Sequence, residues 1–195
     1  MMQFDLTYLP SSDLVSLNTP KHLTLTEFEA LPVPEADYRR RQQIYALEEH
    51  LFSRPEFMDD TEMEAGGMAP KHTFVNGLYH RELYIPPGQL VVGKRHAIEH
   101  IVMLTTGSCS VFTERGVEFL VAPFTFISPA GEKRVVMTHD EGCTWVTLHP
   151  TNKTDLRDIE DEVIIAEPAR QAHYQRLHAE AKEKRMNYEP TEVLS

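Results

Sequence analysis

Short β-rich runs separated by glycine-containing turns fill the chain from His72 to His149, and this spacing limits the fold more than any other feature. The runs are rich in valine, isoleucine, leucine and phenylalanine, and no helical insertion separates them. Turns are predicted at Asn76-Gly77, Pro87-Gly88, Thr106-Gly107, Arg115-Gly116, Ala130-Gly131 and Glu141-Gly142. Many short strands at even spacing predict a mainly β fold, an antiparallel sandwich or barrel.

The segment before the strands lacks the strand pattern. Residues 1–23 carry scattered apolar positions without a period, so we expect an arm, followed by a short helical turn at 24–31. A helix is expected from about Pro34, with apolar residues at helical spacing, until Arg54-Pro55 closes it. Residues 55–70 are acidic and contain few aliphatic side chains, which predicts a mobile loop.

Two helices are predicted after the strands. An acidic helix over 155–162 is expected to cap the barrel, and a last helix is expected from Glu167 to about residue 188. The predicted organisation is therefore an N-terminal arm, helix and loop at 1–70, a barrel at 71–150 and a C-terminal helical extension at 151–195.

The net charge and apolar content exclude several classes of function. A formal net charge of −11 repels a phosphate backbone, and we expect the basic cluster Arg39-Arg40-Arg41 to be a solvated helix face, so nucleic-acid binding is not expected. The longest apolar stretch, 120–127, is far shorter than the roughly 20 residues that span a bilayer. The N-terminus lacks the basic and apolar regions of a secretory signal, so export by that route is not expected and a cytoplasm is the expected location.

Cys109 and Cys143 are the two cysteines, and each lies in a β-rich run. Their spacing fits neither a metal site nor a redox motif. We expect both to be reduced core residues.

Two histidines four residues apart form the clearest chemical constellation. In a strand, His96 and His100 would project from the same face into the interior of a barrel, and His149 lies on an alternating face of the last predicted strand. Three neutral imidazoles can hold one divalent transition metal, such as iron, copper, nickel, manganese or zinc. His80 and His139 are weaker candidates. Inward histidines can also be hydrogen-bonded core residues, and this alternative stays open.

The run that contains these histidines resembles the first motif of the cupin superfamily. His96 falls on the second histidine of that motif, and His100 falls on its glutamate, followed by six residues and then Gly107. The run from Ser128 to Arg134 is similar to the second motif. This resemblance covers about residues 72–150 and implies a cupin-type jelly-roll barrel.

Three ligand positions depart from the cupin pattern. Lys94 stands where the first histidine is expected, His100 replaces the carboxylate, and Arg134 replaces the second-motif histidine. These changes place the standard cupin metal centre in doubt. Within the superfamily, the chain is similar to small cupin-like proteins of tailed bacteriophages, in the runs 93–96, 126–134 and 145–149.

Arg134 and Tyr84 are the candidates for an anion site or a pocket. The planar guanidinium of Arg134 suits a carboxylate or a phosphate, although it can simply pair with Glu82, Glu99 or Glu132. Tyr84 could line a pocket, although aromatic residues in β-rich runs are more often core.

Two functions follow. The first is a non-enzymatic structural or interaction protein, implied by the phage resemblance to be a virion or assembly component. It is supported by the long segments that flank the predicted barrel, and we expect a homo-oligomer or contacts with other virion proteins. The alternative is a metal-dependent cupin enzyme, a small-molecule dioxygenase or isomerase, supported by His96, His100 and His149.

Overall fold

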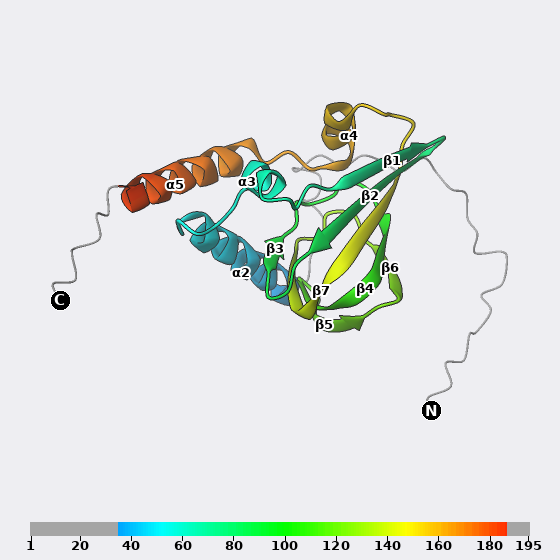
Figure 1. Cartoon of the computed structure of the whole chain (residues 1–195), viewed down its shortest axis with the longest axis horizontal. Coiled ribbons are helices and arrows are strands. Elements are labelled where there is room, and N and C mark those ends of the chain that lie inside the picture. The colour runs from blue at the N-terminus through cyan, green and yellow to red at the C-terminus, as the bar shows by residue number, and fades with distance from the viewer. Residues whose placement is uncertain (1–34, 187–195) are drawn as a thin grey trace.

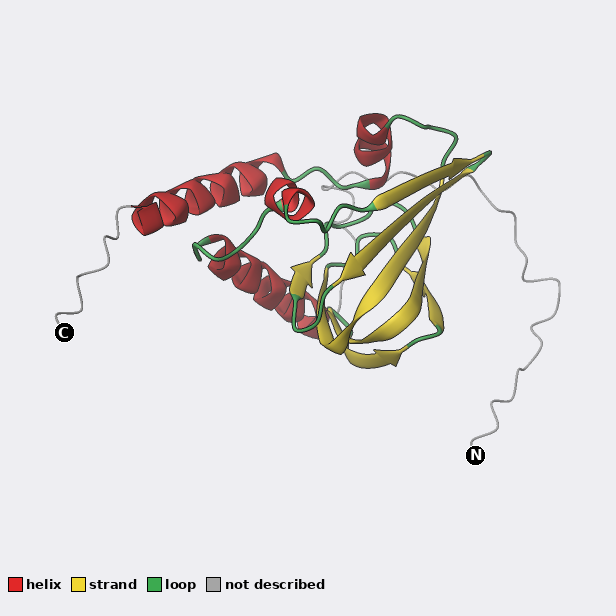
Figure 2. Ribbon diagram, in the orientation of Figure 1, coloured by secondary structure: helices red, strands yellow, loops and turns green. Residues whose placement is uncertain are grey.

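The computed structural model describes residues 35–186, in which seven strands lie between helices at both ends of the sequence (Figures 1 and 2). The order is α2 (Glu35–Phe52), α3 (Asp60–Ala65), β1 (Lys71–Val75), β2 (Leu78–Ile85), β3 (Leu90–Val92), β4 (His100–Thr113), β5 (Gly116–Val121), β6 (Phe124–Ser128), β7 (Arg134–Pro150), α4 (Leu156–Val163) and α5 (Pro168–Met186). The expected arm at 1–23 and helical turn at 24–31 lie outside the described residues.

The strands form one antiparallel sheet that folds back on itself. The first half of β4 pairs with β6, and its second half pairs with β5, while β7 pairs with β4 along both halves. β2 pairs with the second half of β7 and with β1, and β3 pairs with the first half of β7. Two packed layers, β1-β2-β7-β4-β6 and β3-β7-β4-β5, therefore share the long strands β4 and β7. This is the jelly-roll barrel that the sequence predicted, and the mainly β fold class is confirmed.

The two long strands bend where glycines meet. Turns were predicted at Thr106-Gly107 and Glu141-Gly142, but β4 and β7 continue through both positions with irregular register. Gly107 and Gly142 have φ of +73° and +66°, which suits glycine, and a Cβ on Gly107 would lie 1.9 Å from the Gly142 carbonyl oxygen. The prediction of separate strands was wrong because the ladder hydrogen bonds continue on both sides of this close crossing.

The core lies between the two layers. Its buried side chains come from both of them: Leu83, Ile85, Val102, Leu104, Cys109, Val111, Leu120, Val136, Cys143 and Trp145. Cys109 and Cys143 are free and fully buried, as expected. This apolar core fills one end of the barrel and leaves the other end to polar side chains.

α2 and α5 pack against each other beside the barrel (Figure 1). The ring of Phe52 stacks on Tyr174 at 4.8 Å between centroids, and the Tyr174 hydroxyl donates to the Tyr45 carbonyl. α2 begins and ends close to its predicted limits. Arg41, expected on a solvated face, is instead buried and forms an ion pair with Glu114.

The acidic segment before the strands contains a helix, which the prediction of a loop missed. Asp59 caps α3 by accepting from the Glu62 amide, while the Glu62 side chain accepts from the Asp59 amide. Glu62 also binds His178 and Lys182 of α5, both at 2.9 Å. A six-residue helix is too short to be stable alone, so these contacts with α5 hold it.

α4 covers the polar end of the barrel, as expected (Figure 1). Asp155 caps it, and its buried residues Ile159 and Val163 pack against Tyr79 of β2 and Ile98. In the part of the chain that is described, no helix has the length and apolar character to cross a bilayer.

Candidate metal centre

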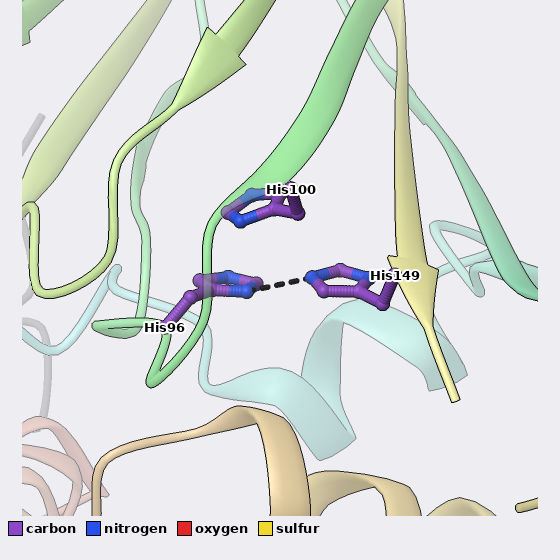
Figure 3. A group of neighbouring side chains, drawn as sticks. All are labelled: His96, His100 and His149. Atoms are coloured by element: carbon purple, nitrogen blue, oxygen red, sulfur yellow. Dashed lines mark hydrogen bonds between the residues drawn. The ribbon is translucent and has the colours of Figure 1, made fainter. Parts of the chain in front are cut away.

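Three histidines from separate segments meet at the polar end of the barrel (Figure 3). His100 is the first residue of β4, and the neighbouring pair Ile101–Leu148 sets the register that brings it opposite His149 of β7. His96 lies in the loop between β3 and β4, so it does not share a strand with His100, and that part of the prediction was wrong.

The loop around His96 is held by backbone hydrogen bonds from two directions. The His96 carbonyl accepts from Gly131, and the Ala97 amide donates to Val163 at the end of α4. The Ile165 amide donates to the Arg95 carbonyl on the other side of His96. These contacts fix the loop so that the His96 imidazole lies beside His100. The two histidines therefore converge as predicted, but through the loop conformation and not through a shared strand.

The three imidazoles lie within contact of one another. His96 Nδ1 and His149 Nε2 are 2.8 Å apart and share a hydrogen bond (Figure 3). The ring of His100 lies 4.2 Å from His96 and 4.5 Å from His149, measured between centroids. One ring nitrogen from each histidine lies within 4.8 Å of the other two.

The histidines are held in the neutral state. Burial is the largest cause and lowers the pKa of His96 well below its usual value, that of His100 to about 4 and that of His149 to about 3. The positive charge of Arg134 lowers the pKa of all three rings further, and that of Arg81 lowers the pKa of His96 and His149.

Neutral rings with free nitrogens are the ligand form of histidine. His100 Nδ1 donates a hydrogen bond to the Ile98 carbonyl at 3.2 Å. In the neutral ring, Nε2 therefore carries the lone pair that can bind a metal. That Nε2 atom is buried and has no hydrogen-bond partner within residues 35–186. The residues present therefore fit a divalent transition metal, which the three imidazoles would hold.

Lys94, at the position of the first cupin histidine, points away from the centre. Its ammonium binds Glu160 at 2.5 Å and Asp60 at 3.1 Å near the surface. It offers no ligand to the histidines.

Arg134 lies at the edge of the histidine group, where the motif comparison placed it. It is buried, donates to the Ser128 hydroxyl, and lies 3.7 Å from Glu132, one of the carboxylates expected as its partner. Burial raises the pKa of Glu132, which also binds Arg115 at 2.7 Å. Arg134 thus faces an internal carboxylate that it shares with a second cation.

Tyr84 and the two weaker histidines lie elsewhere. Tyr84 is 52% exposed and pairs with Thr144. It lies five positions along β2 from Tyr79, which pairs with His149. His139 hydrogen-bonds to Ser108 and Ser110 in the other layer, and His80 alternates to the outer face of β2.

The sequence alone did not single out Arg81, a polar residue that lies beside the histidines, whereas Tyr79 was one of the aromatic residues expected to line a pocket or to lie in the core. Arg81 of β2 pairs with Thr147 of β7, one step from the pair Tyr79–His149. The Tyr79 ring stacks on His149 at 5.9 Å between centroids. The alternation of Tyr79, Arg81 and Leu83 along β2 was the available signal, because these residues share one face of the strand.

Comparison with known proteins finds no matching family model and no matching curated protein. Among similar solved structures is a cupin-2 domain-containing protein from Shewanella frigidimarina, with 14% identity and a TM-score of 0.37, covering 43% of this chain and 80% of that chain. A cupin domain from Bordetella pertussis has 22% identity and a TM-score of 0.36, and the match covers 43% of this chain and 92% of that chain. A cupin 2 conserved barrel domain protein from Salinispora arenicola has 15% identity and a TM-score of 0.37, covering 57% and 82%.

These three structures are named as cupin proteins from bacteria. Their low identity and TM-scores assign no function to this chain. The narrower resemblance to phage proteins gains no support from them.

Proposed function

We propose that this chain is a metal-binding barrel protein in which His96, His100 and His149 hold one divalent transition metal, and that it acts as a metal-dependent enzyme on a small molecule. The observation that carries the proposal is the convergence of three neutral imidazoles, two of which have a buried ring nitrogen without a hydrogen-bond partner in the described part of the chain, His100 Nε2 and His149 Nδ1. Buried polar groups are normally hydrogen-bonded, so an unpartnered nitrogen within a group of three histidines favours a ligand there.

Three protein ligands leave coordination positions for substrate or water, and a bound metal would supply Lewis acidity or redox chemistry there. The protein's own contribution is to orient the rings. Ile98 fixes the tautomer of His100 through its carbonyl, and Tyr79 stacks against His149. Burial and the positive charge of Arg134 lower the pKa of all three rings and so keep them neutral near pH 7. Dioxygenase and isomerase are the reaction classes that we propose.

Elemental analysis of protein purified without chelator tests the metal. We expect about one equivalent of a transition metal in the wild type and less than a tenth of that in the double variant His96→Ala/His100→Ala, with the barrel still folded by circular dichroism. The matched control is His139→Ala, which changes a histidine outside the group and should keep the metal. Full occupancy in the double variant would contradict the assignment.

We also propose an interaction role, as expected for an assembly component such as a virion protein. β5 lies at one end of the strand order, and Val117, Phe119 and Val121 alternate along it with 63%, 67% and 56% of their surface exposed. An exposed apolar edge strand favours pairing with another strand, and a second copy of this chain offers the same edge across a two-fold axis. The proposed partner is therefore a second copy.

Light scattering during size-exclusion chromatography tests this interface. We expect a dimer or larger oligomer for the wild type and a shift toward the 22.4 kDa monomer for Val117→Ser/Phe119→Ser. Removal of residues 1–23, which the sequence predicts to form an arm, tests the contribution of this segment separately. A wild type that is monomeric at all concentrations would refute the interaction role.

A further inference from the structure

A second group of side chains that can bind a metal lies outside the histidine centre, between α3 and α5. It consists of Asp59, Glu62 and His178, and one ligand atom from each lies within 4.8 Å of the other two. Asp59 caps α3 and Glu62 lies in its first turn, whereas His178 belongs to α5, 116 residues beyond Glu62 in the sequence. The fold therefore brings an imidazole from one helix to two carboxylates from another.

The spacing of the ligand atoms suits a single metal ion. His178 Nε2 lies 2.9 Å from Glu62 Oε2 and 3.9 Å from Asp59 Oδ2. Two atoms that each lie about 2.1 Å from a zinc ion, in tetrahedral geometry, are about 3.4 Å apart. The two distances lie on either side of that value, so shifts of about 0.5 Å would bring the three atoms around one ion.

Other contacts hold the ligand atoms in place. Asp59 accepts from the Glu62 amide through Oδ1, and its other oxygen, Oδ2, is the one that faces His178. Glu62 Oε2 accepts from the Asp59 amide. The His178 ring lies 5.9 Å from the rings of Phe52 and Phe57, between centroids, and is nearly perpendicular to both. Side chains that are already ordered lose less entropy when they bind a ligand.

The charges around the group also favour a cation. Lys182 is the lysine or arginine that pairs with these carboxylates within residues 35–186, through Glu62 Oε1 at 2.9 Å. Two carboxylates thus face one ammonium, and Glu64 adds a further negative charge at the exposed side of the same helix. Excess negative charge on a surface raises the local concentration of cations.

We propose that Asp59, Glu62 and His178 bind one divalent transition metal, separate from the histidine centre, and that this ion links α3 to α5. Imidazole and carboxylate together suit zinc and related ions. The Asp59 and Glu62 side chains are 41% and 38% exposed, so water can complete the coordination. Exposure also lets the ion exchange with solvent. We therefore expect much weaker binding than at the buried histidines, and loss of this ion during purification.

Calorimetric titration of chelator-treated protein with zinc chloride tests the site. The double variant His96→Ala/His100→Ala lacks two ligands of the histidine centre, and we expect it to bind about one equivalent of zinc at the second site. In that background, Asp59→Asn should weaken zinc binding at least tenfold. This variant removes the carboxylate but keeps an oxygen that can cap α3, so the helix should persist. His178→Gln should weaken zinc binding at least as much.

The matched control is Glu64→Gln, which removes a negative charge from an exposed position of α3 and should leave zinc affinity unchanged. Circular dichroism establishes that each variant is folded. A second measurement uses the chain with both histidines intact, in which Asp59→Asn should lower the amount of bound zinc by about one equivalent relative to the wild type. A histidine centre that binds no zinc leaves this difference unchanged, so the two metal proposals are tested separately.

Zinc affinity in Asp59→Asn and His178→Gln equal to that of the parent would overturn the inference, because the ion would then be bound by other side chains. Absence of zinc binding by the folded double variant would overturn it as well. If the ion links α3 to α5, zinc should also raise the melting temperature of the double variant and should not raise that of its Asp59→Asn derivative.

Discussion

Arg41 of α2 and Glu114 of the turn between β4 and β5 form a bidentate ion pair, with both N–O distances 2.6 Å and both side chains about nine-tenths buried. The same carboxylate accepts from the Lys133 amide. The hydrogen bonds that Arg41 donates to Glu114 are the largest cause of its raised pKa, and burial acts in the opposite direction. This contact ties α2 to one end of the barrel.

Removing one partner should therefore destabilise the protein strongly. We expect Arg41→Met to lower the free energy of unfolding by about 3–5 kcal/mol, because Glu114 is left as a buried charge. Urea denaturation measures the effect, with Arg176→Met, at an exposed position of α5, as the control. A change below about 1 kcal/mol would show that the pair contributes no more than a surface ion pair.

The contact between Gly107 and Gly142 predicts a steric effect on stability. Gly107→Ala places a Cβ 1.9 Å from a carbonyl oxygen at positive φ, so we expect a loss of about 3 kcal/mol or more in unfolding free energy. Gly88→Ala is the matched control, since Gly88 has φ of +67° and open space around it, and should cost only about 1 kcal/mol. Equal losses at the two positions in thermal denaturation would rule out the crossing as the cause.

The anchoring of α3 by α5 predicts a dependence on acid. The hydrogen bond from Lys182 is the largest cause that lowers the pKa of Glu62, to about 2 from an ordinary 4.5. A carboxyl whose pKa is lower in the folded state stabilises it fully above its unfolded pKa, and the effect is lost as the pH falls toward the folded pKa. The melting temperature of the wild type should exceed that of Glu62→Gln above about pH 5, and the difference should shrink between pH 4.5 and pH 2. A difference independent of pH would show that the charge of Glu62 is not involved.

Metal binding should raise stability through the histidines and not through Lys94. At a free metal concentration of 100 times Kd, linkage adds about 2.7 kcal/mol to the unfolding free energy. Lys94→Ala should retain this gain, because Lys94 binds Asp60 and Glu160 and contributes no ligand. His149→Ala should lose it. Thermal denaturation with and without metal measures both, and a Lys94→Ala protein that no longer responds to metal would contradict the assigned ligand set.

The sequence alone determined the elements whose signals are local. Alternating apolar residues and the glycines of the turns predicted the jelly-roll barrel, and apolar residues at helical spacing predicted α2, α4 and α5. His96 and His100 lie close enough in sequence that both were predicted as ligands of the same metal site. These signals survive because turn chemistry and periodicity act within a few residues.

The tertiary structure decided what depends on distant partners. Arg41 is buried because Glu114, 73 residues away, meets it, and α3 exists because α5 holds Glu62. The register between β2 and β7 alone places Arg81 and Thr147 beside the histidines, and a shift by one residue would turn them to the outer face. Local propensity contains no information on such pairing, so the composition of the site was set by the packing of the whole barrel.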